Sequence, residues 1–326
     1  MKFALAPAAK TSWLDRLAMI GVAGTAVTVL LGELGRFHWR LELLSHFAVQ
    51  YAVALAIGGV YFLLRRRMLW LAIAGVALLL PAWRIAPYAA PSMTPAASSS
   101  GLRVMTINVH ASNDRYDAVR AEIERLDPDI IFLPENTDRW AAGLKPLQAQ
   151  YPYVIDYNSA SVFSLFLFSR VPLLDSVILQ LPEQDGFPAI SARVCREGVD
   201  GSPPRCVRLI GIHPPPPLTA AWAVKRNAVF QAVPELVAAS DVDRTILLGD
   251  FNCTPWSPAL RDLIAATGLR DSAYGFGPQP TWFSRWLPLG IKIDHILIGS
   301  GIAATSHAVG RDVGSDHYPV VADLQF

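Results

Sequence analysis

Charged residues are scarce in this sequence. Only 17% of its 326 residues are Asp, Glu, Lys or Arg, whereas 52% are hydrophobic, which is too apolar for an ordinary soluble protein of this length. The first hundred residues hold nine basic and three acidic residues, and the rest of the chain holds 19 basic and 24 acidic residues. The later part therefore lacks the basic excess of a polybasic nucleic-acid clamp. A metal-assisted nuclease is still compatible with it, because a bound cation changes the charge at its site.

Three apolar runs in the first hundred residues lack the polar face that a surface helix needs. Leu17–Gly32 and Met68–Trp83 carry no charge, and Phe47–Leu64 has only Gln50 as a strongly polar member. Flanking residues can extend each run to the roughly 20 residues that span a bilayer. We therefore predict a membrane domain over residues 1–86 with three transmembrane helices. A cleaved signal peptide would explain only the first run, and the scarcity of polar residues within the spans argues against a transporter.

Basic residues set the expected orientation. Lys2, Lys10 and Arg16 precede the first run, and Arg65–Arg67 fill the turn between the second and third. The positive-inside rule then places the N-terminus in the cytoplasm and everything after the third span on the extracytoplasmic side. Residues 87–100 are small, polar and proline-containing, so we expect a flexible linker there. Residues 101–326 should form the globular domain.

Short apolar runs alternate with helical patterns in the globular part, which favours an α/β layout. Tyr116–Leu126 and Thr219–Val237 have helical spacing, and Ser257 is expected to cap a helix that begins near Pro258. Strands are expected at Leu102–Val109, Asp129–Pro134, Ser161–Ser169, Ile190–Cys195, Cys206–Ile212, Ile246–Leu248, Ile291–Ile298 and Val320–Leu324.

Cysteine is rare, with three in the whole chain. Cys195 and Cys206 lie at matching positions at the base of an expected hairpin, so a disulfide between them is chemically reasonable outside the cytoplasm. Two buried free thiols are the alternative. Cys253 reads as a small buried residue.

Polar residues stand where the expected strands end. Asp250 and Asn252 directly follow a buried run, and a plain Asx turn is the alternative reading of that pair. Other strand ends carry Asn108, Glu135, His213, Asp316 and His317, and Asp294 interrupts the apolar strand expected at Ile291–Ile298. If these ends converge, their oxygen ligands suit a hard divalent ion, Mg²⁺ or Mn²⁺, rather than structural zinc. The chemistry that follows is metal-assisted hydrolysis of a phosphoester.

Five short motifs over residues 101–326 carry a family resemblance: TINVH at 106–110, FLPEN at 132–136, GDFN at 249–252, IDHI at 293–296 and SDHYP at 315–319. In this order they resemble the endonuclease/exonuclease/phosphatase superfamily, in a membrane-attached bacterial branch. The resemblance implies a four-layer α/β sandwich of two packed mixed β-sheets flanked by helices, here preceded by the three transmembrane helices. It also implies a plasma-membrane enzyme that hydrolyses phosphoric esters with Mg²⁺ or Mn²⁺.

The resemblance also implies roles for single residues. Glu135 would be the principal metal ligand, Asp316 a second carboxylate beside the metal, and Asn108 a partner of the metal or of the phosphate. Asp250 would orient or deprotonate the attacking water. Asn252 would bind the phosphate, and His213 would assist the leaving group or stabilise the transition state. Asp294 would orient His317, which would act on the phosphate. His110 and His295 are expected to be structural or to support the residues that act.

Two departures from the family pattern concern the substrate. Pro134 precedes Glu135 where the family usually has Gln, and four prolines follow His213. Trp282, Phe283 and Trp286 could form an aromatic rim, although packing is the reading we favour. The substrate class stays open between nucleic acid and a lipid or small phosphoester, and no protein partner is inferable beyond contact with the bilayer. A catalytically idle binding or scaffold protein that kept the fold is the alternative to an enzyme.

Overall fold

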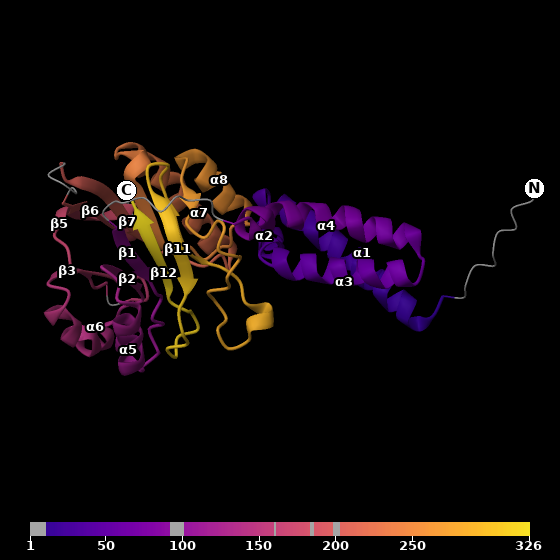
Figure 1. The fold of residues 1–326 in the computed structure, drawn as a ribbon, viewed down its shortest axis with the longest axis horizontal. Coiled ribbons are helices and arrows are strands. Elements are labelled where there is room, and N and C mark those ends of the chain that lie inside the picture. The colour runs from indigo at the N-terminus through magenta and orange to yellow at the C-terminus, as the bar shows by residue number, and fades with distance from the viewer. Residues whose placement is uncertain (1–10, 92–100, 160, 183–185, 198–202) are drawn as a thin grey trace, which may run out of the picture.

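The computed structural model describes residues 11–91, 101–159, 161–182, 186–197 and 203–326. The molecule consists of an elongated bundle of helices and an α/β domain that packs on one end of the bundle (Figure 1). The first described residues and the α/β domain are at opposite ends of the bundle.

Three long helices form the bundle: α1 (Trp13–Glu33), α3 (Ala48–Leu64) and α4 (Met68–Ala89). Between α1 and α3 lie the short η1 (Leu34–Arg36) and α2 (Trp39–Ser45). Trp13–Arg36 and Met68–Ala89 are long and apolar enough to cross a membrane, and α2 with α3 would be a third such span, bent by 58°. The predicted spans therefore coincide with two or three apolar helices.

Apolar side chains point outward from this bundle. Ile20, Ile57 and Val76 are between 65% and 70% exposed, although each lies in the middle of a helix. Water would make that surface costly, whereas the hydrocarbon interior of a bilayer would not. At the end remote from the α/β domain, Arg65 and Arg67 contact Asp15 at 3.2 and 3.6 Å.

Two mixed sheets, each six-stranded in the described residues, form the centre of the α/β domain. The first has the order β11-β12-β1-β2-β4-β3, and its strands are Ala303–Val309, Val320–Gln325, Gly101–Thr106, Ile130–Pro134, Leu165–Ser169 and Tyr153–Tyr157. The second has the order β5-β6-β7-β8-β10-β9, and its strands are Leu173–Leu181, Phe187–Arg196, Arg205–Ile212, Thr245–Asp250, Asp294–Ile298 and Arg270–Asp271. In each sheet one central pair is parallel, β1 with β2 and β7 with β8.

Helices cover the outer faces of both sheets, which gives the expected four layers (Figure 1). On the first sheet lie α5 (Tyr116–Leu126), α6 (Asp138–Leu144) and η2 (Lys145–Ala149). On the second lie α7 (Ala220–Ala238) and α8 (Pro258–Thr267). Ser257 caps α8 as predicted, since its side chain accepts a hydrogen bond from the Ala259 amide. The short η4 (Val242–Arg244) and η5 (Leu287–Leu289) lie in connections.

Apolar side chains from both sheets meet between them. Phe132 of β2 is completely buried in this core, and its ring lies where side chains at Gly211 and Gly249 would otherwise be. A Cβ at Gly211 would approach the Phe132 ring to 2.3 Å, so glycine there permits close packing of the sheets.

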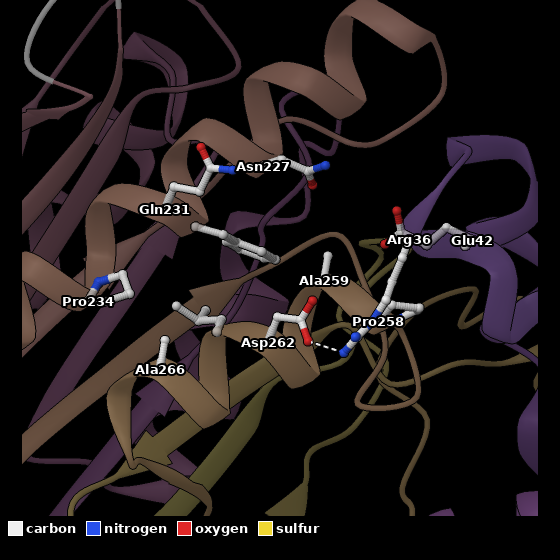
Figure 2. Close-up of a pocket in the computed structure, with 12 residues that line it drawn as sticks. Arg36, Glu42, Asn227, Gln231, Pro234, Pro258, Ala259, Asp262 and Ala266 are labelled. Atoms are coloured by element: carbon white, nitrogen blue, oxygen red, sulfur yellow. Dashed lines mark hydrogen bonds and ion pairs between the residues drawn. The ribbon is translucent and has the colours of Figure 1, made fainter.

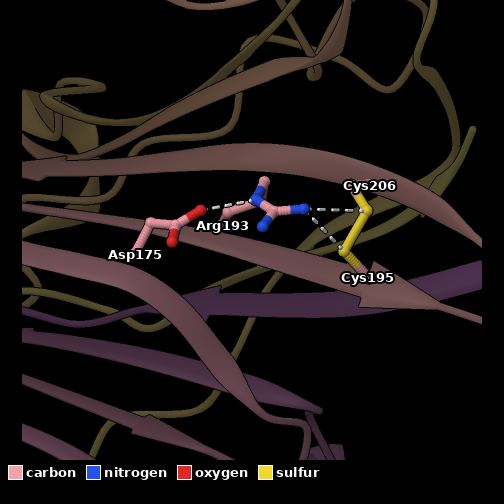
Figure 3. Close-up of a disulfide and its surroundings, with 4 residues drawn as sticks. All are labelled: Asp175, Arg193, Cys195 and Cys206. Atoms are coloured by element: carbon pink, nitrogen blue, oxygen red, sulfur yellow. Dashed lines mark hydrogen bonds and ion pairs between the residues drawn. A yellow bond between two sulfur atoms is a disulfide. The ribbon is translucent and has the colours of Figure 1, made fainter.

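The hairpin formed by β6 and β7 places Cys195 opposite Cys206, and the structure joins them in a disulfide (Figure 3). Arg193 lies beside the sulfur atoms and forms an ion pair with Asp175 at 2.8 Å.

The expected flexible linker differs in part from the structure. Helix α4 continues to Ala89, and Tyr88 is buried against Trp256 and Tyr274 of the α/β domain. Residues 92–100, the rest of that linker, lie outside the described residues. The α/β domain is therefore packed directly on the helix ends, because an aromatic side chain just after residue 86 is buried there.

Charged groups also join the two parts. Arg226 of α7 and Glu42 of α2 form a buried ion pair at 2.5 Å, and Glu42 also accepts a hydrogen bond from Ser257. Nearby, Arg36 and Asp262 pair at the surface, where both side chains are more than half exposed. Figure 2 shows Arg36 reaching Asp262 across a cavity of about 420 Å³ between the helices and α7 and α8.

Replacing Arg226 with Met should destabilise the full-length chain. The change leaves the Glu42 carboxylate buried without its cation, which costs about 3–5 kcal/mol. For an α/β domain of the size of residues 101–326, that corresponds to a fall in Tm of roughly 6–20 °C. The measurement is thermal unfolding of the detergent-solubilised protein. Arg36→Met is the matched control, expected to cost less than about 1 kcal/mol because exposed pairs contribute little. Equal effects of the two substitutions would show that the buried pair does not hold the junction.

Candidate active site

Polar residues from both sheets meet at one edge of the sandwich. Strands β1, β2, β7 and β8 run toward this edge, and Asn108, Glu135, His213 and Asp250 stand at or just beyond their ends. Strands β10 and β12 run the opposite way, so Asp294, Asp316 and His317 reach the same edge at or just before their starts. The strand ends therefore converge at one edge of the sandwich.

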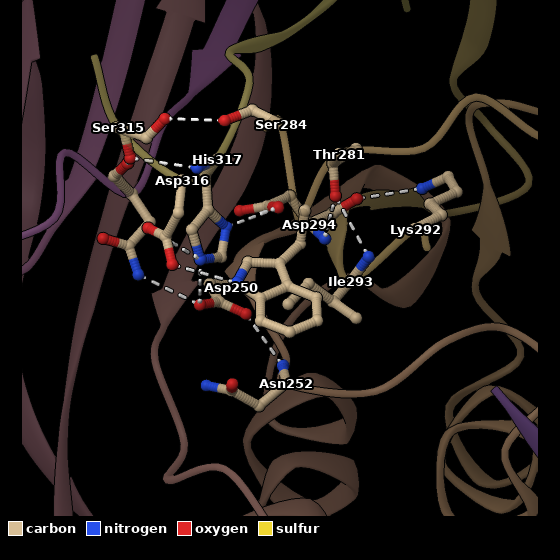
Figure 4. A network of polar contacts seen from close by, with 12 residues as sticks. Asp250, Asn252, Thr281, Ser284, Lys292, Ile293, Asp294, Ser315, Asp316 and His317 are labelled. Carbon is tan, nitrogen blue, oxygen red and sulfur yellow. Dashed lines mark hydrogen bonds and ion pairs between the residues drawn. The ribbon is translucent and has the colours of Figure 1, made fainter. Parts of the chain in front are cut away.

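Asp250 lies at the centre of this group and is 1% exposed (Figure 4). One carboxylate oxygen accepts a hydrogen bond from the backbone N–H of Asn252 at 2.8 Å. The other accepts one from Nδ2 of Asn108 at 3.1 Å and faces Nε2 of His213 and of His317 at 3.5 and 3.7 Å. Burial disfavours the charged form, but the two imidazoles and the Asn108 amide outweigh it and hold the pKa of Asp250 below its usual value. Asp250 is thus an ionised carboxylate in a closed environment.

His317 connects two buried carboxylates. Its Nδ1 lies 2.9 Å from Oδ2 of Asp294, and its Nε2 faces Asp250. The hydroxyl of Thr281 accepts hydrogen bonds from the Asp294 and Ile293 amides, which fixes the start of β10. Burial lowers the pKa of His317, but the carboxylates of Asp294 and Asp250 raise it to about 10. The ring is therefore protonated near neutral pH, with its Nε2–H directed at the centre of the site.

His213 follows β7, and the four prolines after it prevent the strand from continuing. The ring is buried beside Phe163, at 5.6 Å between centroids, with Nε2 toward Asp250. Burial lowers the pKa of His213, but hydrogen bonding to Asp250 and the charges of Asp250 and Glu135 raise it overall. The side chain of Asn252 donates to the Pro214 carbonyl at 3.0 Å, which places it next to the segment that carries His213.

Glu135, Asp316 and His110 form a more open side of the site. Nδ1 of His110 lies 3.3 Å from Oδ1 of Asp316 and 3.9 Å from Oε2 of Glu135. Trp282 donates from its indole nitrogen to the other oxygen of Asp316 at 3.1 Å. The sequence did not assign this contact to Trp282, and it placed His110 outside the site. Only their three-dimensional neighbours reveal both.

The backbone is strained at three of these positions. His110, Glu135 and Asn252 have φ values of 59°, 62° and 52°, in the left-handed region that residues with a Cβ rarely adopt. Such conformations persist where the surrounding structure enforces them, and they cluster at functional sites. At Glu135 the turn directs both carboxylate oxygens to the Asn108 side chain and the Ala111 amide.

Two places in the site could hold a divalent cation. Asp250, Asp294 and His317 offer ligand atoms within 4.8 Å of one another, but His317 and Asp294 already hydrogen-bond to each other. Glu135 and Asp316 fit a cation better. Oδ1 of Asp316 is buried without a hydrogen bond among the described residues. This atom and Oε2 of Glu135 both face the position that Nδ1 of His110 occupies, where a cation could bind between them.

Asn108 was expected beside the metal, and the structure gives its amide a different orientation. The nitrogen donates to both Glu135 and Asp250, while the oxygen accepts from the His110 amide. Reversing the amide would place its oxygen against two carboxylates, so this orientation is the favoured one. Asn108 therefore acts as a bridging donor in this arrangement.

A cavity of about 630 Å³ opens onto these residues. Its floor includes Glu135, His213, Asp250, Asn252 and Asp316, whereas most of its wall is apolar. Leu43, His46 and Phe47, from the segment between α1 and α3, form part of that wall. This contribution could not be predicted from the sequence, because Phe47 and its neighbours have the apolar pattern of the beginning of a span.

A second buried cluster lies behind the site. Asp271 accepts from Tyr88 at 3.0 Å and contacts Lys292 and His295 at 3.2 and 3.4 Å. Lys292 also donates to the Asp294 carbonyl at 2.9 Å, so the cluster supports the start of β10. Burial would raise the pKa of Asp271, but Lys292 and the neighbouring histidines lower it well below its usual range. His295 belongs to this cluster and lies outside the cavity, in agreement with its expected structural position.

The sequence matches the Endonuclease/Exonuclease/phosphatase family over residues 105–317. Among solved structures, an endonuclease/exonuclease/phosphatase from Bacteroides vulgatus has a TM-score of 0.56 and 20% identity, covering 70% of this chain and 99% of that one. A Neisseria 3′ phosphatase bound to a product DNA hairpin has a TM-score of 0.54 and 21% identity, covering 69% and 100%. D. rerio TDP2 with single-strand DNA product has a TM-score of 0.55 and 18% identity, covering 70% and 100%. Among curated proteins no sequence matches.

Asp271→Asn should destabilise the protein by about 3–5 kcal/mol, because it leaves the Lys292 ammonium buried without a counter-charge. The lowered pKa of Asp271 also sets how the free energy of unfolding depends on pH. The carboxylate stabilises the fold above its unfolded pKa of about 4, and this contribution declines as the pH falls below that value. Thermal unfolding between pH 3 and 7 should therefore show a flatter profile for Asp271→Asn than for the natural chain. The double variant Asp271→Asn/Lys292→Met should recover part of the loss. Additive single and double effects would mean that the two groups do not interact.

Proposed function

Because the chain belongs to the endonuclease/exonuclease/phosphatase family, we propose that it is a membrane-anchored phosphoester hydrolase that depends on Mg²⁺ or Mn²⁺. The observation that best supports this proposal is the buried Asp250 carboxylate between His213 and His317, with the Glu135 and Asp316 oxygens on the open side of the site. The arrangement supplies an acceptor for a water proton, donors for phosphate oxygens and carboxylates for a cation.

We assign the cation to Glu135 and Asp316. A bound Mg²⁺ or Mn²⁺ would neutralise charge on the phosphate and polarise the P–O bond. Asn108 holds Glu135 in place and joins it to Asp250. His110 would move aside from the point that the two carboxylates face.

Asp250 is assigned to the attacking water. Its lowered pKa keeps it ionised, and the Asn252 amide fixes the orientation of one oxygen. The protonated His317 donates to a phosphate oxygen and is oriented by Asp294. His213 stabilises the charge that develops on the phosphate, or donates a proton to the leaving oxygen, and Asn252 binds the phosphate.

The membrane assignment is supported by the exposed apolar surface of α1, α3 and α4. The turn Arg65–Arg67 and the start of α1 lie at the end of the bundle remote from the α/β domain. The positive-inside rule then favours a cytoplasmic N-terminus and an extracytoplasmic α/β domain in a plasma membrane.

Among phosphoester hydrolases, a nuclease or 3′ phosphatase competes with an enzyme that acts on a lipid or small phosphoester, because two of the similar structures contain product DNA. A catalytically idle scaffold is the alternative outside the class. Several buried ionisable groups at one edge are costly to fold, and a scaffold has no use for them. That cost favours an enzyme.

Hydrolysis of bis(p-nitrophenyl) phosphate by the full-length protein in detergent tests this function. We expect turnover with Mg²⁺ or Mn²⁺ and its loss with EDTA. Asp250→Asn and His317→Gln should each lower kcat by roughly 10²–10⁴-fold, because each removes a group that acts on the water or the phosphate. Glu135→Gln should raise the metal concentration needed for half-maximal activity.

Asp175→Asn is the matched control, since it makes the same chemical change at an exposed carboxylate at the other end of the second sheet. It should retain full activity. Activity that survives EDTA, or that falls less than tenfold in Asp250→Asn, would contradict the proposed mechanism.

Topology can be tested with single cysteines and a membrane-impermeant maleimide. Glu124→Cys, on the exposed face of α5, should react in intact cells. Arg66→Cys, in the turn between α3 and α4, should react only after the membrane is opened. The natural cysteines should give little background, because Cys253 is buried and the other two are joined. The reverse labelling pattern would place the α/β domain in the cytoplasm.

A further inference from the structure

We propose that the substrate is an amphiphilic phosphoester resident in the membrane, whose phosphate reaches Asp250 while its apolar part rests on Leu43, Phe47, Val162, Phe163, Leu218 and Trp222. This inference rests on the proposed function and narrows its substrate class. Three observations support it: the apolar lining of the cavity, the contacts that hold the cavity against the helix ends, and the absence of lysine and arginine among the described residues that line it.

The cavity is larger than a phosphate requires. Its volume of about 630 Å³ is in the range of sites that enclose a drug-sized ligand. Most of the polar groups lie on the floor, with His46 in the wall, and much of the remaining lining is aliphatic, aromatic or proline. Leu218, Val162 and Trp222 are 67%, 43% and 38% exposed, so the apolar wall extends to the mouth. An apolar group attached to the phosphate would cover this surface.

The wall includes residues that lie next to a proposed span. Phe47 directly precedes α3, and Val53, six residues later, is 53% exposed on the outside of that helix. At 1.5 Å per residue the two are about 9 Å apart along the helix axis. The polar headgroup layer is roughly 5–7 Å thick on each side of the hydrocarbon. With Val53 at the edge of the hydrocarbon, the cavity wall at Phe47 lies at the outer edge of the lipid headgroup layer.

Buried contacts fix this depth. His46 hydrogen-bonds through Nδ1 to the Thr254 hydroxyl at 3.1 Å, and Thr254 lies in the loop that follows Asp250. Gln50, in the first turn of α3, donates to the Gly290 carbonyl at 2.9 Å. With the Glu42–Arg226 pair, these contacts hold the mouth against the helix ends.

The charges of the cavity do not suit a nucleic-acid strand. Affinity for a polyphosphate backbone comes largely from Lys and Arg contacts to successive phosphates. Among the described residues that line this cavity, none is lysine or arginine. One phosphate with an apolar substituent matches the lining, and a polyanion does not.

Two esters that differ only in their apolar group provide the test: methyl p-nitrophenyl phosphate and hexadecyl p-nitrophenyl phosphate. The full-length protein is assayed in phosphatidylcholine nanodiscs with Mg²⁺ or Mn²⁺. We expect kcat/KM to be at least about tenfold higher for the hexadecyl ester, because burial of its chain adds binding energy. Plasmid DNA should be cut more slowly than the hexadecyl ester is hydrolysed.

Phe47→Ser and Leu218→Ser should each reduce the hexadecyl-to-methyl ratio about tenfold, because each removes apolar contact area. Leu218 is mostly exposed, so its substitution leaves the fold intact. Phe37→Ser is the matched control: Phe37 lies in the same segment between α1 and α3, is 83% exposed and lies outside the cavity, so the ratio should stay the same.

Equal kcat/KM for the two esters, an unchanged ratio in both wall variants, or preference for DNA would overturn the substrate inference while leaving a phosphoester hydrolase in place. If neither ester is hydrolysed, the proposed function fails, and binding decides the inference separately. Hexadecyl phosphate should then quench tryptophan fluorescence of the natural chain at lower concentration than of Phe47→Ser. Equal binding curves would refute the amphiphilic site as well.

Discussion

Neutralising the buried Asp250 carboxylate is the constraint that organises this site. An ionised carboxylate without partners would be too costly to bury, so the fold must bring donors and positive charge to it. They come from both sheets: Asn108 after β1, His213 after β7 and His317 before β12. Strand register adds a second carboxylate, because Asp294 pairs directly with Asp250 across β10 and β8. The protonated His317 between them removes the repulsion that two such groups would otherwise have.

This constraint explains why much of the site could be predicted from the sequence. The directions of the strands determine at which edge of the sheets these polar residues lie. The parallel central pair of each sheet brings the residues that follow its strands to the same edge. Strand limits were less accurate. Val109 and Ile293 are buried and apolar, yet β1 ends at Thr106 and β10 starts at Asp294. Apolar character reports burial and does not distinguish a hydrogen-bonded strand from a buried loop.

The features that the sequence did not predict arise from contacts between distant segments. His110 faces Asp316 because its backbone is left-handed, and Trp282 reaches the same carboxylate from a connection rich in proline and aromatic residues. Neither property follows from periodicity. The same holds for the apolar wall from Leu43 and Phe47, since an apolar residue at the end of a span gives no indication that it lines a site in another domain.

Direct packing of the α/β domain on the helix ends changes what the helical bundle can do. A free linker of 14 residues would let the domain move by roughly 20 Å and present any face to its surroundings. The Glu42–Arg226 pair and the buried Tyr88 instead fix one orientation. A buried ion pair contributes little net stability compared with apolar packing, so its contribution here is to fix the orientation. Asp271 then connects the two parts physically, because the carboxylate that accepts from Tyr88 at the end of α4 also holds Lys292, which supports the Asp294 backbone in the site.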